Sequence, residues 1–142
     1  MNEPSYHLEH YDTIPKEYEE VLYRGISEEA FQAKGLPPIC AFSIFIKDQQ
    51  EQVLGGASGT LFYGSLYVDS LWIDKTLRHQ GWGTKLMQEA EKIGKAKGAR
   101  FVTVNTMDWE ALSFYQKLGY SIEFTREGYD KDSQMFMLRK AL

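Results

Sequence analysis

Residues 78–84, Arg-His-Gln-Gly-Trp-Gly-Thr, combine the residue types that can hold a phosphate group. Their two glycines let the backbone approach a ligand closely, and Arg78 supplies a positive charge. An apolar run, Ser70–Ile73, precedes them, and a segment with helical periodicity, Thr84–Lys97, follows. The first N–H groups of a helix have no acceptor within the helix and therefore face an anion. This order of strand, glycine-rich turn and helix predicts a binding loop for a phosphorylated cofactor.

The spacing of the glycines excludes two common phosphate loops. A Walker loop requires G-x-x-x-x-G-K-[ST], which does not fit here. A dinucleotide fingerprint requires a third glycine at the position of Leu86. What remains, R-x-x-G-x-G between a strand and a helix, resembles the acetyl-CoA pyrophosphate loop of the GNAT superfamily of N-acetyltransferases. The alternative is an ordinary tight turn before a helix.

A second motif follows the next predicted strand, Arg100–Asn105, which is rich in β-branched and aromatic residues. Residues 111–120 read Ala-Leu-Ser-Phe-Tyr-Gln-Lys-Leu-Gly-Tyr and resemble the GNAT signature A-x-x-F-Y-x-K-x-G-[FY]. Asp108 is the predicted N-cap of this helix, and Gly119 suits the left-handed position after its end. Two motifs in the right order around a strand extend the resemblance over residues 53–142.

The chain of 142 residues, 43% of them hydrophobic, is expected to form one GNAT-like acetyltransferase domain over residues 1–142. The resemblance implies an α+β (α/β three-layer) fold, in which helices flank a mixed, mostly antiparallel central sheet that is splayed at the cofactor site. Before the first motif we expect a strand at Tyr6–His10, a helix over Pro15–Ala33 with a break near Gly25, and three strands, Ile39–Lys47, Val53–Phe62 and Leu66–Asp74. After the second motif, Tyr120–Thr125 and Gln134–Arg139 are expected to close the sheet as an antiparallel pair.

The resemblance implies acetyl-CoA as co-substrate and no metal ion. The backbone near Leu71, Trp72 and Ile73 would polarise the thioester carbonyl and pair with the pantetheine arm. The remaining cofactor-binding residues implied are Arg78, His79, Gln80, Gly81, Trp82, Gly83, Thr84, Asn105, Ala111 and Phe114. Two of these side chains have a structural alternative, since Trp72 would also suit a core and Asn105 a turn or cap. Lys85, in the first helical turn, is placed to meet a cofactor phosphate.

Forming an amide from a thioester requires a deprotonated amine, a polarised carbonyl and protonation of the leaving thiolate. The resemblance makes Tyr115 the candidate general acid, because the family places a tyrosine near the sulfur at this position. A phenol has an ordinary pKa of about 10, so it is protonated and able to donate at neutral pH. The alternative for Tyr115 is a purely structural tyrosine in the core.

The general base is less well defined. Alternation along a strand places Tyr67 and Asp69 on one face, and family members often carry Glu or His at one of these positions. Asp69 is the carboxylate there, and a water relay from it is the interpretation we adopt. A structural or surface aspartate is the alternative.

Charge is distributed unevenly along the chain. Residues 1–65 carry ten acidic and four basic residues, a net charge of −6, whereas residues 66–142 carry ten acidic and twelve basic residues, a net charge of +2. The second half therefore suits a polyanionic cofactor, and the first half favours a cationic amine or serves as a solubilising surface. The chain has no basic patch for nucleic acid and no apolar run long enough for a membrane span.

The N-terminus lacks the features of a signal peptide, so a cytoplasmic protein is expected. A single cysteine, Cys40, excludes an intrachain disulfide, and its apolar neighbours predict a buried thiol. A homodimer is left open.

The resemblance implies an enzyme that moves an acetyl group from acetyl-CoA to a primary amine by direct attack in a ternary complex. The acceptor is a small-molecule or a protein amine. The alternative from another class is a GNAT-fold module that binds acyl-CoA without turnover, as a sensor or interaction domain. Longer acyl donors on the same scaffold are also left open.

Overall fold

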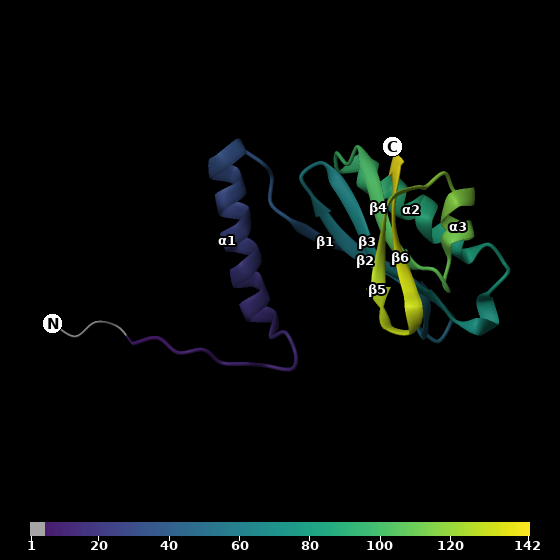
Figure 1. The fold of residues 1–142 in the computed structure, drawn as a ribbon, viewed down its shortest axis with the longest axis horizontal. Helices are drawn as coiled ribbons and strands as arrows, with labels where there is room; N and C mark the ends of the chain where they lie inside the picture. Colours follow the sequence, from purple (N-terminus) through teal and green to yellow (C-terminus); the bar gives the residue numbers. More distant parts are fainter. Residues whose placement is uncertain (1–4) are drawn as a thin grey trace. The chain divides into compact units, whose positions relative to one another are not determined.

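The computed structural model describes residues 5–142 of the chain. It divides into two compact units, one ending at Pro38 and the other beginning at Ile39. The first unit contains helix α1 (Lys16–Lys34), and the second contains every strand and the other helices (Figure 1). The single domain expected over the whole chain stays a prediction.

Helix α1 is continuous across Gly25, so the predicted break is wrong. A glycine inside a helix costs about 1 kcal/mol relative to alanine, and the good helix formers around Gly25 outweigh that cost. The helix ends at Gly35, whose φ of 66° is left-handed and whose N–H reaches back to the carbonyls of Ala30 and Phe31. The strand predicted at Tyr6–His10 is also wrong, because this stretch is irregular and residues 5–38 contain no strand with which it could pair.

The second unit is built on one six-stranded sheet with the order β1-β2-β3-β4-β6-β5. Its strands are β1 (Cys40–Lys47), β2 (Val53–Phe62), β3 (Ser65–Ile73), β4 (Phe101–Met107), β5 (Ser121–Tyr129) and β6 (Ser133–Ala141). Short 3-10 turns, Lys75–Leu77 and Asp130–Asp132, follow β3 and β5. Only β3 and β4 are parallel, and the other neighbouring pairs are antiparallel. The predicted mixed, mostly antiparallel sheet is therefore confirmed.

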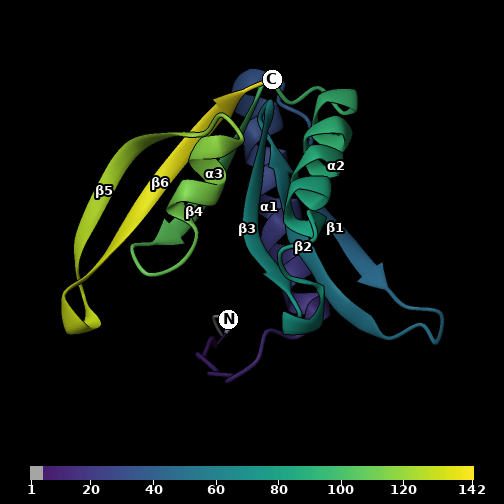
Figure 2. The same ribbon diagram turned by 90° about the vertical axis from the view of Figure 1, so that its right-hand side faces the viewer.

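Two helices accompany the sheet, α2 (Trp82–Ala96) and α3 (Leu112–Lys117). Figure 2 shows α2 beside β2 and β3, and α3 beside β4 and β6. Helix α3 begins at Leu112, so Asp108 is not its N-cap as predicted. Residues 108–111 instead form a turn after β4, in which the Asp108 N–H donates to the Gln134 carbonyl (2.9 Å).

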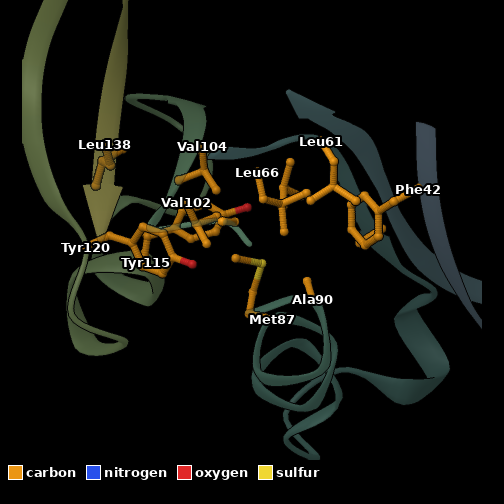
Figure 3. Close-up of a cluster of buried hydrophobic side chains, with 13 residues drawn as sticks. Phe42, Leu61, Leu66, Met87, Ala90, Val102, Val104, Tyr115, Tyr120 and Leu138 are labelled. Atoms are coloured by element: carbon orange, nitrogen blue, oxygen red, sulfur yellow. The ribbon is translucent and has the colours of Figure 1, made fainter. Parts of the chain in front are cut away.

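The core lies between α2, α3 and one face of the sheet (Figure 3). Met87 and Ala90 of α2 are fully buried and point toward sheet residues such as Leu66 and Val102. Burial alternates along β2, so its odd-numbered residues from Gly55 to Leu61 face this core and the even-numbered ones face away. Cys40, predicted to be buried, is exposed, because it begins an edge strand ahead of the buried Phe42.

Candidate functional site

The site begins where β3 and β4 part. These parallel strands pair only over Ser65–Val68 and Phe101–Val104. Beyond these residues both strands continue without pairing to each other, and their ribbons diverge (Figure 2). We call this divergence the fork. It leaves the backbone edge of β3 from Asp69 to Ile73 without a strand on the β4 side. This is the splay that was predicted for the central sheet.

A β-bulge lies at the apex of the fork. Gly59 of β2 pairs with Val68, but Ser58 pairs with Ser70, so Asp69 is the extra residue. A Cβ atom on Gly59 would lie 1.8 Å from the Tyr67 carbonyl oxygen. Only glycine permits such a close approach of the two strands, so Gly59 makes the bulge sterically possible.

A cavity of about 440 Å³ fills the fork. Its lining comes from β3, β4, the turn before α3, α3 itself and β6. The lining residues are Tyr67, Val68, Asp69, Ser70, Leu71, Trp72, Asn105, Thr106, Met107, Glu110, Ala111, Tyr115 and Met135. The fold thus brings together both predicted catalytic residues and four of the predicted cofactor residues, Leu71, Trp72, Asn105 and Ala111.

The two predicted catalytic residues lie on opposite sides of the sheet. Tyr115 belongs to the buried cluster formed with α2. Asp69 accepts hydrogen bonds from the hydroxyls of Ser70 (2.9 Å) and Ser58 (3.4 Å). Since Ser58 is an even-numbered residue of β2, this carboxylate lies on the face away from α2. The fork therefore has Tyr115 on one side and an exposed carboxylate on the other.

Tyr115 is only 6% exposed, and burial raises the pKa of its phenol to about 12, with a smaller contribution from the negative charge of Glu110. The hydroxyl therefore keeps its proton throughout the neutral range. Its ring packs edge-on against Phe114 and Tyr120, at centroid distances of 5.1 Å and 5.8 Å. Its position in the core agrees with both interpretations of this residue, since it also lines the cavity.

The phosphate loop, residues 78–84, continues from the end of β3. Arg78 is anchored by its Nε, which donates to the carbonyl of Ile73 (3.0 Å), and its terminal nitrogens remain at an exposed position. Gly81 has a φ of +84° and precedes α2, whose first intrahelical bond is from Lys85 N–H to the Gly81 carbonyl (3.1 Å). The N–H groups of residues 82–84 precede that bond, as an anion-binding loop requires.

Several side chains of the loop and its surroundings have protein partners. Gln80 donates through Nε2 to the Thr76 carbonyl (3.1 Å), which stabilises the loop itself. Lys85 lies over the Trp82 ring, with Nζ 4.4 Å from its centroid. His79 is exposed and has a φ of +61°, which is uncommon for a residue other than glycine.

Gly83 and Phe114 are in close contact. A Cβ atom on Gly83 would lie 3.1 Å from the Phe114 ring and 3.3 Å from Cδ1 of Ile73. Gly83 thus allows the first turn of α2 to pack closely against α3 and β3. Phe114 is expected to bind the cofactor. Its ring packs against this first turn and so supports the phosphate loop.

Trp72 is 56% exposed and lines the cavity, so the alternative of a core tryptophan is wrong. Asn105 donates from Nδ2 to the Tyr67 hydroxyl (2.8 Å), so the alternative of a simple cap is wrong as well. Glu110 accepts from the Met107 N–H through Oε1 (2.9 Å), which closes the turn that leads into α3.

Sequence reasoning assigned no role to Tyr67, although it stands on the same face as Asp69. It also missed Met107 and Met135, which no motif marks.

Two further observations concern what the described residues lack. Among residues 5–142, no group of three or more His, Cys, Asp or Glu side chains is placed to hold a metal ion. Within the same part of the chain, no helix is long and apolar enough to cross a membrane.

The buried phenols predict a loss of stability at high pH. Burial raises the pKa of Tyr115 to about 12 and also raises that of Tyr120, whose hydroxyl donates to Glu91. In the unfolded chain both phenols ionise near pH 10. Their stabilising effect is complete below that pH and is lost as the pH rises toward 12, by up to about 1.4 kcal/mol per pH unit for each group. We expect the free energy of unfolding in urea to fall between pH 9.5 and 11, and less steeply in Tyr115→Phe. An equal slope in the variant would contradict the burial of this phenol.

Comparisons with known proteins agree with this geometry. The model of the Acetyltransferase (GNAT) family matches residues 8–120. Blasticidin-S acetyltransferase of Streptomyces morookaense is 28% identical over 106 residues, which cover 74% of this chain and 78% of that protein. The crystal structure of an acetyltransferase from Bacillus cereus is similar with a TM-score of 0.76 and 26% identity, covering 94% of this chain and 98% of that one. An aminoglycoside 6′-N-acetyltransferase solved with coenzyme A shares the fold, with a TM-score of 0.63, 19% identity and coverage of 71% and 72%.

Proposed function

Because the chain belongs to the GNAT acetyltransferase family, we propose that it moves the acetyl group of acetyl-CoA to a primary amine by direct attack in a ternary complex. The chain is an acetyltransferase, and acetyl-CoA is its co-substrate. The observation that supports direct attack is the fork. It joins a cavity with Tyr115 on one side of the sheet to a carboxylate on the other, with a phosphate loop at the end of the same strand.

The loop and β3 would hold the cofactor. The N–H groups at the start of α2 and the guanidinium of Arg78 suit the two charges of a pyrophosphate. The unpaired edge of β3 offers backbone N–H and carbonyl groups to the amides of the pantetheine arm, as a neighbouring strand would. A backbone N–H between Leu71 and Ile73 would stabilise the negative charge that develops on the thioester oxygen.

Tyr115 would donate its proton toward the sulfur as the carbon–sulfur bond breaks. Its raised pKa keeps the phenol protonated through the neutral and mildly alkaline range, in which the amine becomes nucleophilic. Tyr115 lines the cavity and belongs to the buried cluster on the α2 side of the sheet, which is the side on which the phosphate loop leads into α2. The leaving thiolate and its proton donor would therefore share one side of the sheet.

Asp69 would take the proton of the amine through a water molecule. Its carboxylate is exposed, and the two serine hydroxyls bind the same oxygen, Oδ1, which leaves Oδ2 for a water molecule. The amine would thus approach from the face opposite to the leaving group, which is the geometry that direct attack requires.

We infer that the acceptor is a small cationic amine. Asp69 and Glu110 both line the cavity, so the site has negative charge where an ammonium group would arrive. The relatives named above carry the names of blasticidin S and aminoglycosides, which are small amines of this kind. A lysine or N-terminal amine of a protein is the competing acceptor.

Initial-rate kinetics test the direct attack. With the concentrations of acetyl-CoA and amine both varied, a ternary complex gives intersecting double-reciprocal lines. Parallel lines, together with acetylated protein after incubation with acetyl-CoA alone, would indicate a covalent acetyl-enzyme and would contradict the proposal.

The phosphate loop has its own test in Gly83→Leu. The new side chain would meet Phe114 and Ile73, so the first turn of α2 must move away. Its N–H groups would then no longer point toward the phosphate. Hydrogen bonds to charged groups contribute about 1.5–3 kcal/mol, so the Kd of acetyl-CoA by calorimetry should rise at least about tenfold. Gln88→Ala, on the same helix but at an exposed position beyond its first turn, is the control and should leave the Kd within about twofold. An unchanged Kd in folded Gly83→Leu would show that the loop does not bind the cofactor.

A further inference from the structure

A hydrogen bond crosses the fork at its apex. Asn105 on β4 donates from Nδ2 to the hydroxyl of Tyr67 on β3 (2.8 Å). Both side chains are half-buried, and both line the cavity. The bond connects the two strands just where their backbone pairing stops, at Val68 and Val104.

The chemistry of the two groups fixes the direction of the Tyr67 proton. The amide nitrogen of Asn105 can only donate, so the phenol oxygen must accept, and its own O–H has to point elsewhere. Within residues 5–142 the hydrogen bond found at this hydroxyl is the one from Asn105, and Tyr67 lines the cavity. Burial raises the pKa of Tyr67, and the negative charge of Asp69 adds to the effect, so the phenol stays protonated at neutral pH. The Tyr67 O–H is thus a positioned hydrogen-bond donor in the cavity, available to an acceptor on a bound substrate.

The position of Tyr67 determines which reactant meets this donor. Burial alternates along the start of β3, where Leu66 and Val68 face the core with α2 and Tyr67 faces away. The phosphate loop leads into α2, and Tyr67 precedes the end of β3 by six residues, about 20 Å along the strand. Tyr67 therefore shares its face with Asp69, on the side from which the amine would attack.

We propose that Tyr67 determines the acceptor specificity of this site by donating a hydrogen bond to an oxygen of the amine substrate, with Asn105 as the residue that positions the phenol. This inference rests on the proposed function. With Asp69 receiving the ammonium group, the favoured acceptor carries a hydroxyl or carbonyl oxygen near its amino group, as an amino sugar does. A polyamine without oxygen leaves the Tyr67 donor unsatisfied and binds less well. In this proposal Asn105 acts as the partner of Tyr67, in place of the pantetheine ligand that the family resemblance implies.

The test measures binding and does not depend on turnover. Kanamycin, which carries hydroxyls beside its amines, and spermidine, which has no oxygen, are titrated by calorimetry into protein saturated with coenzyme A. We expect kanamycin to bind more tightly than spermidine. Tyr67→Phe should weaken the binding of kanamycin about three- to tenfold, which is the usual effect of losing one neutral hydrogen bond, and should leave the binding of spermidine unchanged.

Asn105→Asp provides the matched variant for the positioning role. The new carboxylate would accept the Tyr67 proton and remove the donor from the cavity, while its negative charge would attract both polycations. The ratio of the spermidine Kd to the kanamycin Kd should therefore fall toward the ratio measured in Tyr67→Phe. The double variant Tyr67→Phe/Asn105→Asp should show no further change in this ratio. The Kd of coenzyme A should stay constant throughout.

Three results would overturn the inference. They are an absence of kanamycin binding, an equal effect of Tyr67→Phe on both amines, and weaker coenzyme A binding in Asn105→Asp with an unchanged ratio. The last result would make Asn105 a cofactor ligand. Acetyl transfer is assayed separately, so a protein that binds amines selectively but releases no coenzyme A would contradict the proposed function and not this inference.

Discussion

Replacing Tyr115 with phenylalanine is expected to lower kcat by about a hundredfold and to leave the Kd of acetyl-CoA within about twofold. The phenol would donate its proton to the sulfur only as the thioester collapses, so its loss removes an interaction that is stronger in the transition state than in the bound complex. Proton transfer by a positioned side chain typically contributes 10²–10⁴-fold, and the lower end suits a thiolate, which is a good leaving group. Steady-state kinetics with calorimetry of acetyl-CoA provide both measurements.

Tyr120→Phe is the matched control. It removes the hydroxyl group of a buried ring whose centroid lies 5.8 Å from that of Tyr115. The Tyr120 hydroxyl donates to Glu91, and Tyr120 does not line the cavity. We expect this variant to be less stable and to retain kcat within a few fold. If Tyr115→Phe stays folded and loses less than about threefold in kcat, Tyr115 is a core residue and not the general acid.

Gly59→Ala is expected to destabilise the second unit severely, by at least about 3 kcal/mol. Its Cβ atom would lie 1.8 Å from the Tyr67 carbonyl oxygen, which belongs to the backbone and cannot rotate away. Strands β2 and β3 would have to separate at the bulge, and that movement would displace Asp69 and Tyr67 together. Urea unfolding, followed by circular dichroism, measures the loss.

Thr60→Ala is the control for this variant, because it changes the next residue of β2 on the opposite face of the strand. It should cost about 1 kcal/mol or less. A Gly59→Ala protein as stable as Thr60→Ala would show that the bulge at Asp69 is not present as described.

The sequence was informative wherever local chemistry decides the structure. The strand, the glycine-rich turn and the amphipathic helix around Arg78 were predicted from spacing alone, and the helix begins only two residues before the predicted Thr84. Gly119 has the expected left-handed φ of +98°. The helix break predicted at Gly25 and the N-cap predicted at Asp108 were local errors, whereas the error at Cys40 arose because long-range contacts decide. Cys40 has apolar neighbours in the chain, but it begins an edge strand, and sequence does not show which strand forms the edge.

The site was only partly predictable for the same reason. Motifs located Tyr115 and the phosphate loop because their residue types stand at fixed spacing. Alternation placed Tyr67 and Asp69 on one face, but a bulge depends on the partner strand, so the role of Gly59 needed the structure. The hydrogen bond between Tyr67 and Asn105 joins residues 38 positions apart, and no pattern along the chain indicates it. Their pairing is the feature that sequence analysis was least able to find.

The measurement that tests the account most directly is the release of coenzyme A from acetyl-CoA in the presence of defined amines, with Tyr115→Phe assayed in parallel. The panel contains kanamycin, blasticidin S, streptothricin, spermidine and a lysine peptide. We expect release that depends on a small cationic amine and that falls about a hundredfold in the variant. Acetyl-CoA that binds normally by calorimetry but is not consumed with any of these amines would contradict it and would favour a binding module without turnover.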